Sequence, residues 1–152
     1  MSRKKCKRKV YQLVDPIQTA IKGACITETH LIDQIKLKEL VAIESMQKGQ
    51  ATLEDWRSLV DMVNLCEMFI KRGVGQEALN DCNAAHESLR LAAIRFKKTG
   101  KMGLDGTGLK AIKEVYEWHS LQRTSVNRSM YEQIIKDVEN HIKSKSKEVV
   151  MI

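Results

Sequence analysis

Apolar residues spaced three and four positions apart, in segments separated by glycines, most constrain the fold of this chain. Such spacing places side chains on one face of an α-helix, whereas a strand needs strict alternation, which the sequence shows over no useful length. The chain has a single proline, Pro16, and is rich in the helix-favouring residues Leu, Ile, Ala, Lys and Glu. Its 152 residues predict an all-α fold, a single-domain bundle of five or six amphipathic helices.

Capping residues and glycines set the expected helix boundaries. Asp15 before Pro16 is typical of a helix start, and Thr52 with Asp55 resembles a capping box. Four glycines within residues 100–108 indicate a loop, after which Thr107 is the expected cap. The predicted helices cover residues 15–23, 27–48, 52–73, 75–100, 107–124 and 130–142. In the second and fourth of these, the residues expected to face inward include Leu31, Ile32, Ile35, Leu40, Ile43, Met46, Leu79, Cys82, Leu89 and Phe96.

Charge is distributed along the sequence in blocks. Residues 1–9 carry six basic residues and no acidic one, and residues 10–89 carry seven basic and twelve acidic ones. Residues 90–113 are again basic, with seven basic residues against Asp105, while residues 114–152 balance. Such polarity predicts binding to a charged partner and says nothing of fold. The expected organisation is a flexible basic arm (1–14), a helical bundle domain (15–143) and a frayed C-terminal tail (144–152).

Cysteine spacing and hydropathy predict a soluble cytoplasmic protein. The four cysteines, at positions 6, 25, 66 and 82, form no CxxC motif and indicate neither a disulfide framework nor a zinc site. No segment approaches the roughly 18 continuous apolar residues of a membrane span. The polar residues after Val10 also argue against a signal peptide. We therefore expect reduced thiols and no membrane association.

Two groups of residues are candidates for chemical sites. Cys82 and His86 share a helical face, yet zinc needs further ligands that no nearby pair supplies, so Cys82 is expected in the core and His86 at its edge. Glu114, Glu117, His119 and Arg123 are expected on the charged outer face of an amphipathic helix rather than in a catalytic site. The prediction is a non-enzymatic protein with no catalytic residue, metal or cofactor.

Basic residues are the candidate contacts to a partner or to phosphates. The glycine-rich loop before a helix also allows anion contact, although it lacks the P-loop spacing and a preceding strand. The arm has two alternatives, a solvated tail and a strap folded on the acidic residues 10–89. The candidate contact residues are Arg3, Lys4, Lys5, Lys7, Arg8, Lys9, Arg95, Lys97, Lys98, Lys101 and Lys110.

Several short segments resemble a group of small, uncharacterised bacteriophage and prophage proteins. These segments are Ser2-Arg3-Lys4-Lys5, Asp15-Pro16-Ile17, His30-Leu31 with Ile35-Lys36-Leu37-Lys38, Gly49-Gln50-Ala51-Thr52 with Asp55, Met62-Val63-Asn64-Leu65 with Glu67, Gly100-Lys101-Met102, and Glu117, His119 and Gln122. The resemblance covers most of the chain. It implies phage origin and a host bacterial cytoplasm, and it transfers no catalytic or binding residue.

Two functions are therefore expected. The first is a phage-encoded binding protein that acts on a host or phage protein of nucleic-acid metabolism or defence, as an inhibitor or adaptor. The alternative is direct, largely sequence-independent binding to a DNA or RNA backbone through the arm and the 90–113 band. Apolar faces on every helix, together with charge blocks of opposite sign, also leave homodimerisation open.

Overall fold

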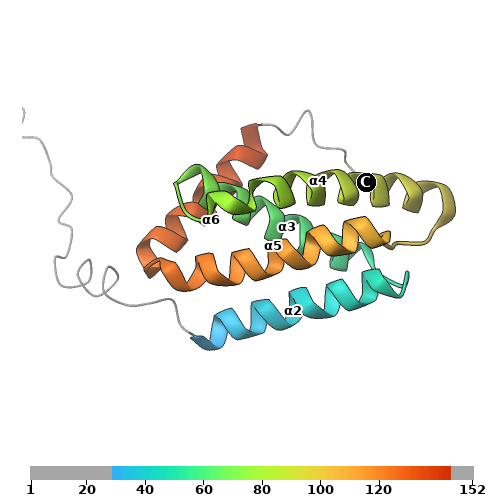
Figure 1. The fold of residues 1–152 in the computed structure, drawn as a ribbon, viewed down its shortest axis with the longest axis horizontal. Helices are drawn as coiled ribbons and strands as arrows, with labels where there is room; N and C mark the ends of the chain where they lie inside the picture. The colour runs from blue at the N-terminus through green and yellow to red at the C-terminus, as the bar shows by residue number, and fades with distance from the viewer. Residues whose placement is uncertain (1–28, 145–152) are drawn as a thin grey trace, which may run out of the picture.

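A computed structural model describes residues 29–144 of the chain (Figure 1). Its helices are α2 (Thr29–Gln47), α3 (Leu53–Lys71), the short 3-10 helix η1 (Gln76–Ala78), α4 (Leu79–Thr99), α5 (Gly106–Ser125) and α6 (Arg128–Ser144). No strand occurs within these residues, which confirms the all-α bundle. The predicted helix 15–23, the arm 1–14 and residues 145–152 of the predicted tail lie outside the described residues. No helix between residues 29 and 144 has the length and apolar character needed to cross a membrane.

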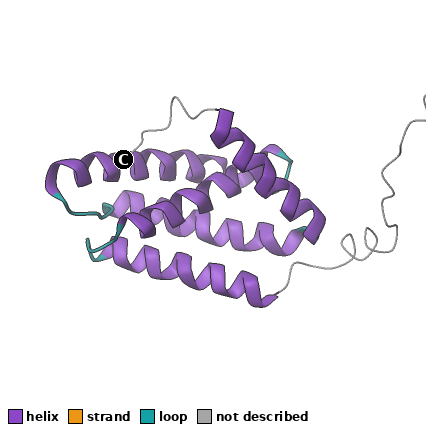
Figure 2. Ribbon diagram, turned by 180° about the vertical axis from the view of Figure 1, so that it is seen from behind, coloured by secondary structure: helices purple, strands orange, loops and turns teal. Residues whose placement is uncertain are grey.

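Helix α3 lies at the centre of the bundle, where it contacts α2, α4, α5 and α6. Helices α2, α5 and α4 follow one another from bottom to top in Figure 1, and α6 lies at the left, where it passes behind the start of α4. Figure 2 shows the same bundle from behind. Leu59, Met62 and Val63 of α3 are fully buried in the main core. A smaller cluster around Phe69 and Tyr131 fixes α6 against the C-terminal half of α3.

Capping explains most helix boundaries. Thr52 and Asp55 form the predicted capping box, with the Asp55 amide donating to Thr52 Oγ1 at 3.1 Å and the Thr52 amide to Asp55 Oδ2 at 2.8 Å. The expected cap at Thr107 is wrong: Asp105 caps α5, accepting from the Gly108 amide at 2.7 Å. The fourth helix also begins later than predicted, because η1 occupies its first residues.

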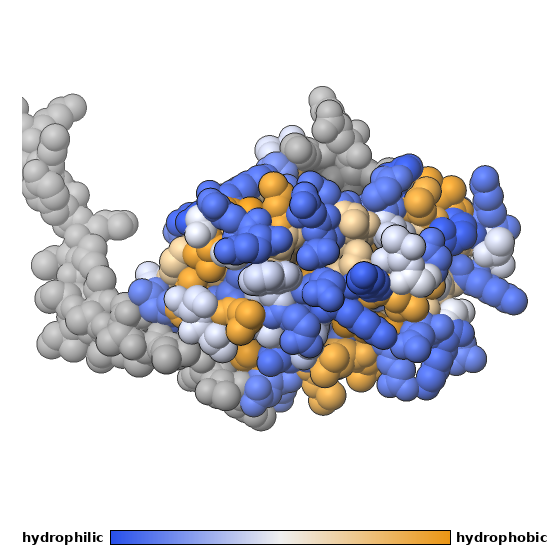
Figure 3. Space-filling view, viewed as in Figure 1, coloured by the Kyte–Doolittle hydropathy of each residue, from blue (hydrophilic) through white to orange (hydrophobic). Residues whose placement is uncertain are grey.

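Several residues expected to face inward are exposed. Leu31, Ile35 and Leu40 of α2 are 51%, 40% and 46% exposed, and Leu79 at the start of α4 is 45% exposed. Among the described helices, α2 makes extensive contacts with α3 and α5 alone. It therefore buries a narrow stripe that runs through Ile32, Ile43 and Met46. Apolar surface is therefore visible along the lower edge of the molecule, over α2 (Figure 3).

The predicted charged outer face of α5 is confirmed for the exposed Glu114 and Glu117 but is wrong for Arg123 and His119. Both are fully buried. The Arg123 guanidinium makes two hydrogen bonds to the Glu39 carboxylate of α2, one of them from Nη1 at 3.0 Å. Burial alone would lower the pKa of Arg123, but the Glu39 carboxylate outweighs it and raises that pKa above its ordinary value. A buried ion pair thus joins α2 to α5.

Gln122, the neighbour of Arg123 in the sequence, links His119 to the connection between α3 and η1. Its Nε2 donates to the Val74 carbonyl at 2.9 Å, which leaves Oε1 to accept from Nδ1 of His119 at 3.0 Å. The His119 proton therefore lies on Nδ1, and Nε2 has no hydrogen-bond partner among the described residues. Burial and, to a lesser degree, the Arg123 charge lower the pKa of His119 to about 3. The folded protein holds this imidazole neutral.

We predict that breaking the Glu39–Arg123 pair on one side costs far more than removing both partners. Arg123→Met or Glu39→Met should each lower the free energy of unfolding by about 3–5 kcal/mol, because each leaves a buried charge uncompensated. The double variant should cost less than either single variant, as measured by urea unfolding. Lys48→Met, which removes the exposed Lys48–Glu44 pair at 2.6 Å, is the control and should leave the midpoint unchanged. Additive costs in the double variant would contradict the coupling.

We also predict an acid-sensitive stability that depends on His119. The pKa of His119 in the folded protein lies below the ordinary 6.5, so between pH 6.5 and pH 3 the unfolded state binds a proton that the folded state does not. The stability that is present above pH 6.5 is therefore lost as the pH falls toward 3. Between pH 7 and pH 5 this contributes a loss of about 2 kcal/mol. His119→Asn keeps an amide donor near the Nδ1 position, and its stability should fall less over this interval. Parallel unfolding curves across this pH range for the two proteins would rule out His119 as the cause.

Candidate functional site

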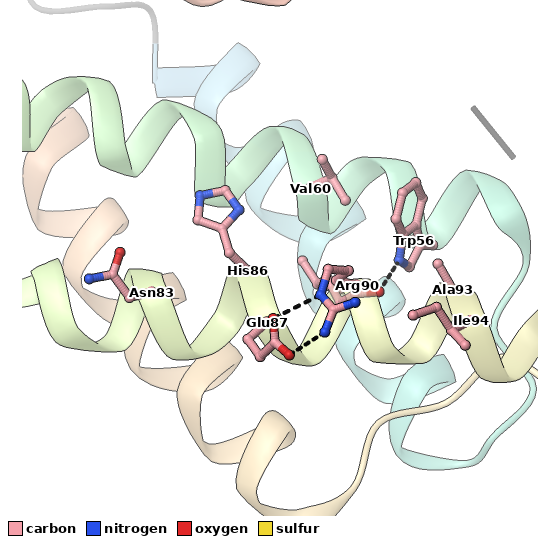
Figure 4. A pocket seen from close by; sticks show the side chains of 9 residues that line it. Trp56, Val60, Asn83, His86, Glu87, Arg90, Ala93 and Ile94 are labelled. Atoms are coloured by element: carbon pink, nitrogen blue, oxygen red, sulfur yellow. Dashed lines mark hydrogen bonds and ion pairs between the residues drawn. The ribbon is translucent and has the colours of Figure 1, made fainter. Parts of the chain in front are cut away.

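A surface groove between α3 and α4 is the best-formed candidate site. It encloses about 450 Å³ and is shown in Figure 4. Trp56 and Val60 project into it from α3, while α4 contributes the remaining wall. The residues that line this groove, called the α3/α4 groove below, are Trp56, Val60, Asn83, His86, Glu87, Leu89, Arg90, Ala93 and Ile94.

Trp56 is fixed in place at one end of the α3/α4 groove. Its indole Nε1 donates to the Leu89 carbonyl of α4 at 2.9 Å, and its ring packs on the main core. This hydrogen bond uses the single polar atom of the side chain, so the exposed part of the ring offers apolar surface. Ala93 and Ile94 lie close to the indole (Figure 4) and continue that surface. One end of the groove is therefore rigid and apolar.

Away from this apolar end the groove carries charged side chains, which are paired with one another. Arg90 Nε donates to Glu87 Oε2 at 2.9 Å, one turn along α4 (Figure 4). Burial opposes ionisation of Glu67 on α3, but the Lys71 and His86 charges outweigh it and lower the pKa of Glu67. His86 Nε2 lies 3.0 Å from Glu67 Oε2. These contacts place an ionised carboxylate beside an imidazole.

His86 also borders a second hollow, of about 340 Å³, which continues the α3/α4 groove toward α6. Its other lining residues are Asn64, Glu67, Met68, Val138, His141 and Ile142. From Trp56 to Glu67 the α3 wall of the two hollows is roughly 17 Å long at the α-helical rise. Together, the α3/α4 groove and this second hollow form one elongated depression. Its apolar end lies at Trp56, and His86 lies near its middle.

The structure brings together part of the predicted basic band. Arg95 and Lys101 line a shallow hollow of about 680 Å³ at the end of the bundle where the α2–α3 and α4–α5 loops meet. Lys48, which the sequence analysis did not select, lines it as well. This surface, called the basic end below, also contains Asp105, and Arg95 Nη2 donates to the Gly103 carbonyl at 3.1 Å.

The remaining predicted contact residues lie elsewhere. Lys97 and Lys98 are exposed on the last turn of α4, where they also complement the helix dipole, and Lys110 is exposed on α5. Neither these three nor Lys101 forms an ion pair with another described residue. The arm residues Arg3, Lys4, Lys5, Lys7, Arg8 and Lys9 lie outside the described part of the chain.

The glycine-rich loop is not built as an anion cradle. The Asp105 carboxylate accepts a hydrogen bond from the amide of Gly108, the third residue of α5, and so takes one of the amides that a bound phosphate would use. A Cβ on Gly108 would lie 2.9 Å from the Ser88 Cβ of α4, and one on Gly103 would lie 3.0 Å from the Gly49 Cα. Gly108 therefore allows close packing of α5 on α4, and Gly103 allows close packing of the α4–α5 loop on the α2–α3 loop.

The α3/α4 groove is not recognisable from the sequence, because Trp56 and Val60 have the same helical spacing as core residues. The expected places of Cys82 in the core and His86 at its edge are confirmed. Three comparisons with known proteins returned nothing: no family model matches the sequence, and neither a curated protein nor a solved structure matches it. The resemblance to phage proteins thus stays a prediction from the sequence.

Proposed function

We propose that this chain is a non-enzymatic, phage-encoded binding protein whose α3/α4 groove holds a segment of a host or phage protein. The observation that carries the proposal is the rigid apolar end of the groove, where Trp56 and Ile94 remain partly exposed. Trp and Arg dominate the binding energy of protein interfaces, and both residue types line this groove. The phage origin rests on the sequence resemblance.

The shape of the depression favours a peptide segment over a small polar metabolite. A wall of roughly 17 Å matches about three turns of a helix, a common occupant of apolar grooves. Small-molecule sites direct several unpaired polar groups at the ligand. Here Glu87 and Arg90 bind each other, as do Glu67 and His86.

The lining also favours binding over catalysis. Among the described residues, no serine, threonine, cysteine or lysine lines either hollow, so this lining offers the His86–Glu67 pair no hydroxyl, thiol or amine nucleophile to activate. Paired in this way, the imidazole and the carboxylate can still orient a polar group of a bound segment.

We expect groove variants to lose the protein partner. Ile94→Glu should reduce capture of a specific protein from nuclease-treated bacterial lysate at least tenfold, because it places a charge in the apolar end of the groove. Leu37→Glu on α2 is the matched control: Leu37 is 63% exposed and lies outside the groove, so capture should persist. A photo-crosslinking residue at Asn83 should label the same protein. Equal capture by both variants would contradict the proposed site.

A second candidate function, binding to a nucleic-acid backbone, is favoured by the exposed and unpaired lysines near the basic end. Lys97, Lys98 and Lys101 have no acidic partner among the described residues, so their charges are available to phosphates. Asp105 weakens this surface locally. Arm residues 1–9 would add six further charges in the same role.

If phosphates are the target, affinity should fall steeply with salt. Each neutralised phosphate contributes a log–log slope of about −0.9 for duplex DNA, so the triple variant Lys97→Ala, Lys98→Ala, Lys101→Ala should flatten the slope by up to about 2.7. Lys136→Ala, an exposed lysine on α6, serves as control. Deleting residues 1–9 should flatten it further and leave the melting temperature unchanged. Fluorescence anisotropy that finds no salt dependence for the full chain would remove this candidate.

A further inference from the structure

Two thiols meet in the core between α3 and α4. Cys66 Sγ and Cys82 Sγ are 3.2 Å apart, and both side chains are fully buried. In the sequence these two cysteines are separated by a loop, and neither belongs to a CxxC motif. The fold alone brings them together, on the two helices whose outer sides form the α3/α4 groove.

The two sulfurs differ in acidity. Contact with Cys66 lowers the pKa of Cys82, although burial acts against it, and the same contact together with burial raises the pKa of Cys66. Cys82 is therefore the sulfur that ionises first, and Cys66 keeps its proton. This asymmetry suits stepwise oxidation, in which a thiolate reacts first and a neighbouring thiol completes the bond.

We propose that Cys66 and Cys82 are a redox modification site and form a reversible intramolecular disulfide when the protein meets a small peroxide. The Cys82 thiolate attacks one peroxide oxygen, the O–O bond breaks, and hydroxide leaves, giving a sulfenic acid. The Cys66 sulfur then attacks the Cys82 sulfur, the S–O bond breaks, and water leaves with the Cys66 proton. Two electrons pass from the sulfurs to the peroxide, and the net products are one disulfide and two water molecules for hydrogen peroxide.

The geometry favours this product over further oxidation. A disulfide needs its sulfurs about 2.05 Å apart, so the pair must close by roughly 1.1 Å, a movement within reach of side-chain adjustment in two packed helices. Burial excludes bulky thiols, which favours a small oxidant and an intramolecular partner. The bond would lie one residue before Glu67 and Asn83, both of which line the depression, and would link its two walls. This chemistry is independent of what binds there.

The test uses the full chain with Cys6→Ser and Cys25→Ser, so that Cys66 and Cys82 are the remaining thiols. After treatment of the folded protein with hydrogen peroxide, we expect both thiols to disappear in a denatured thiol assay. The monomer should become two hydrogen atoms lighter by mass spectrometry, and peptide mapping should recover the segment holding Cys66 joined to the one holding Cys82. Dithiothreitol should restore both thiols.

Cys82→Ala in the same background is the control, and here Cys66 should keep its thiol or gain oxygen without losing two hydrogens. If that variant fails to fold, the peptide map of the parent background decides alone. Two persistent thiols, a gain of oxygen without the cross-linked peptide, or cross-links solely between separate chains would each overturn the proposal.

Discussion

The Glu39–Arg123 ion pair determines how α2 is seated on the bundle. Removing two charges from water costs several kcal/mol per ion, a cost that close pairing must offset, so a rotation of α2 that separates them is strongly opposed. Apolar packing alone would not fix that rotation, because α2 carries Leu31, Ile35, Leu37 and Leu40 on sides left exposed. The ion pair therefore adds specificity for one orientation of α2 to that given by the buried stripe of Ile32, Ile43 and Met46.

A second polar contact of α5 reaches the connection that leads into α4. Arg123 is adjacent to Gln122, whose amide binds the Val74 carbonyl in the connection between α3 and η1. That connection sets where α4 begins beside α3, and the two helices form the walls that hold Trp56 and His86. A hydrogen bond from α5 thus holds the segment that precedes one wall of the α3/α4 groove.

Local signals were easier to interpret from the sequence than tertiary ones. The capping box at Thr52 and the helix-ending Gly73 and Gly100 were predictable, because their chemistry is complete within a few residues. Arg123 was misplaced because a charged residue is normally exposed, and its partner Glu39 lies 84 positions away. Trp56 has the same helical spacing as the buried residues of α3: spacing gives the face of a helix, whereas the packing of α4 shows how much of that face stays open.

Gly75, in the connection between α3 and η1, lies directly against the buried Gln122 side chain of α5. It has a φ of +74°, and a Cβ there would lie 2.8 Å from Gln122 Nε2. Any other residue would be strained in this backbone conformation and would also press on the amide that assigns the His119 proton to Nδ1. Tolerance to mutation in this protein therefore does not follow depth: a side chain added at Gly75, between α3 and η1, would disturb the hydrogen bonds of the buried Gln122 and His119.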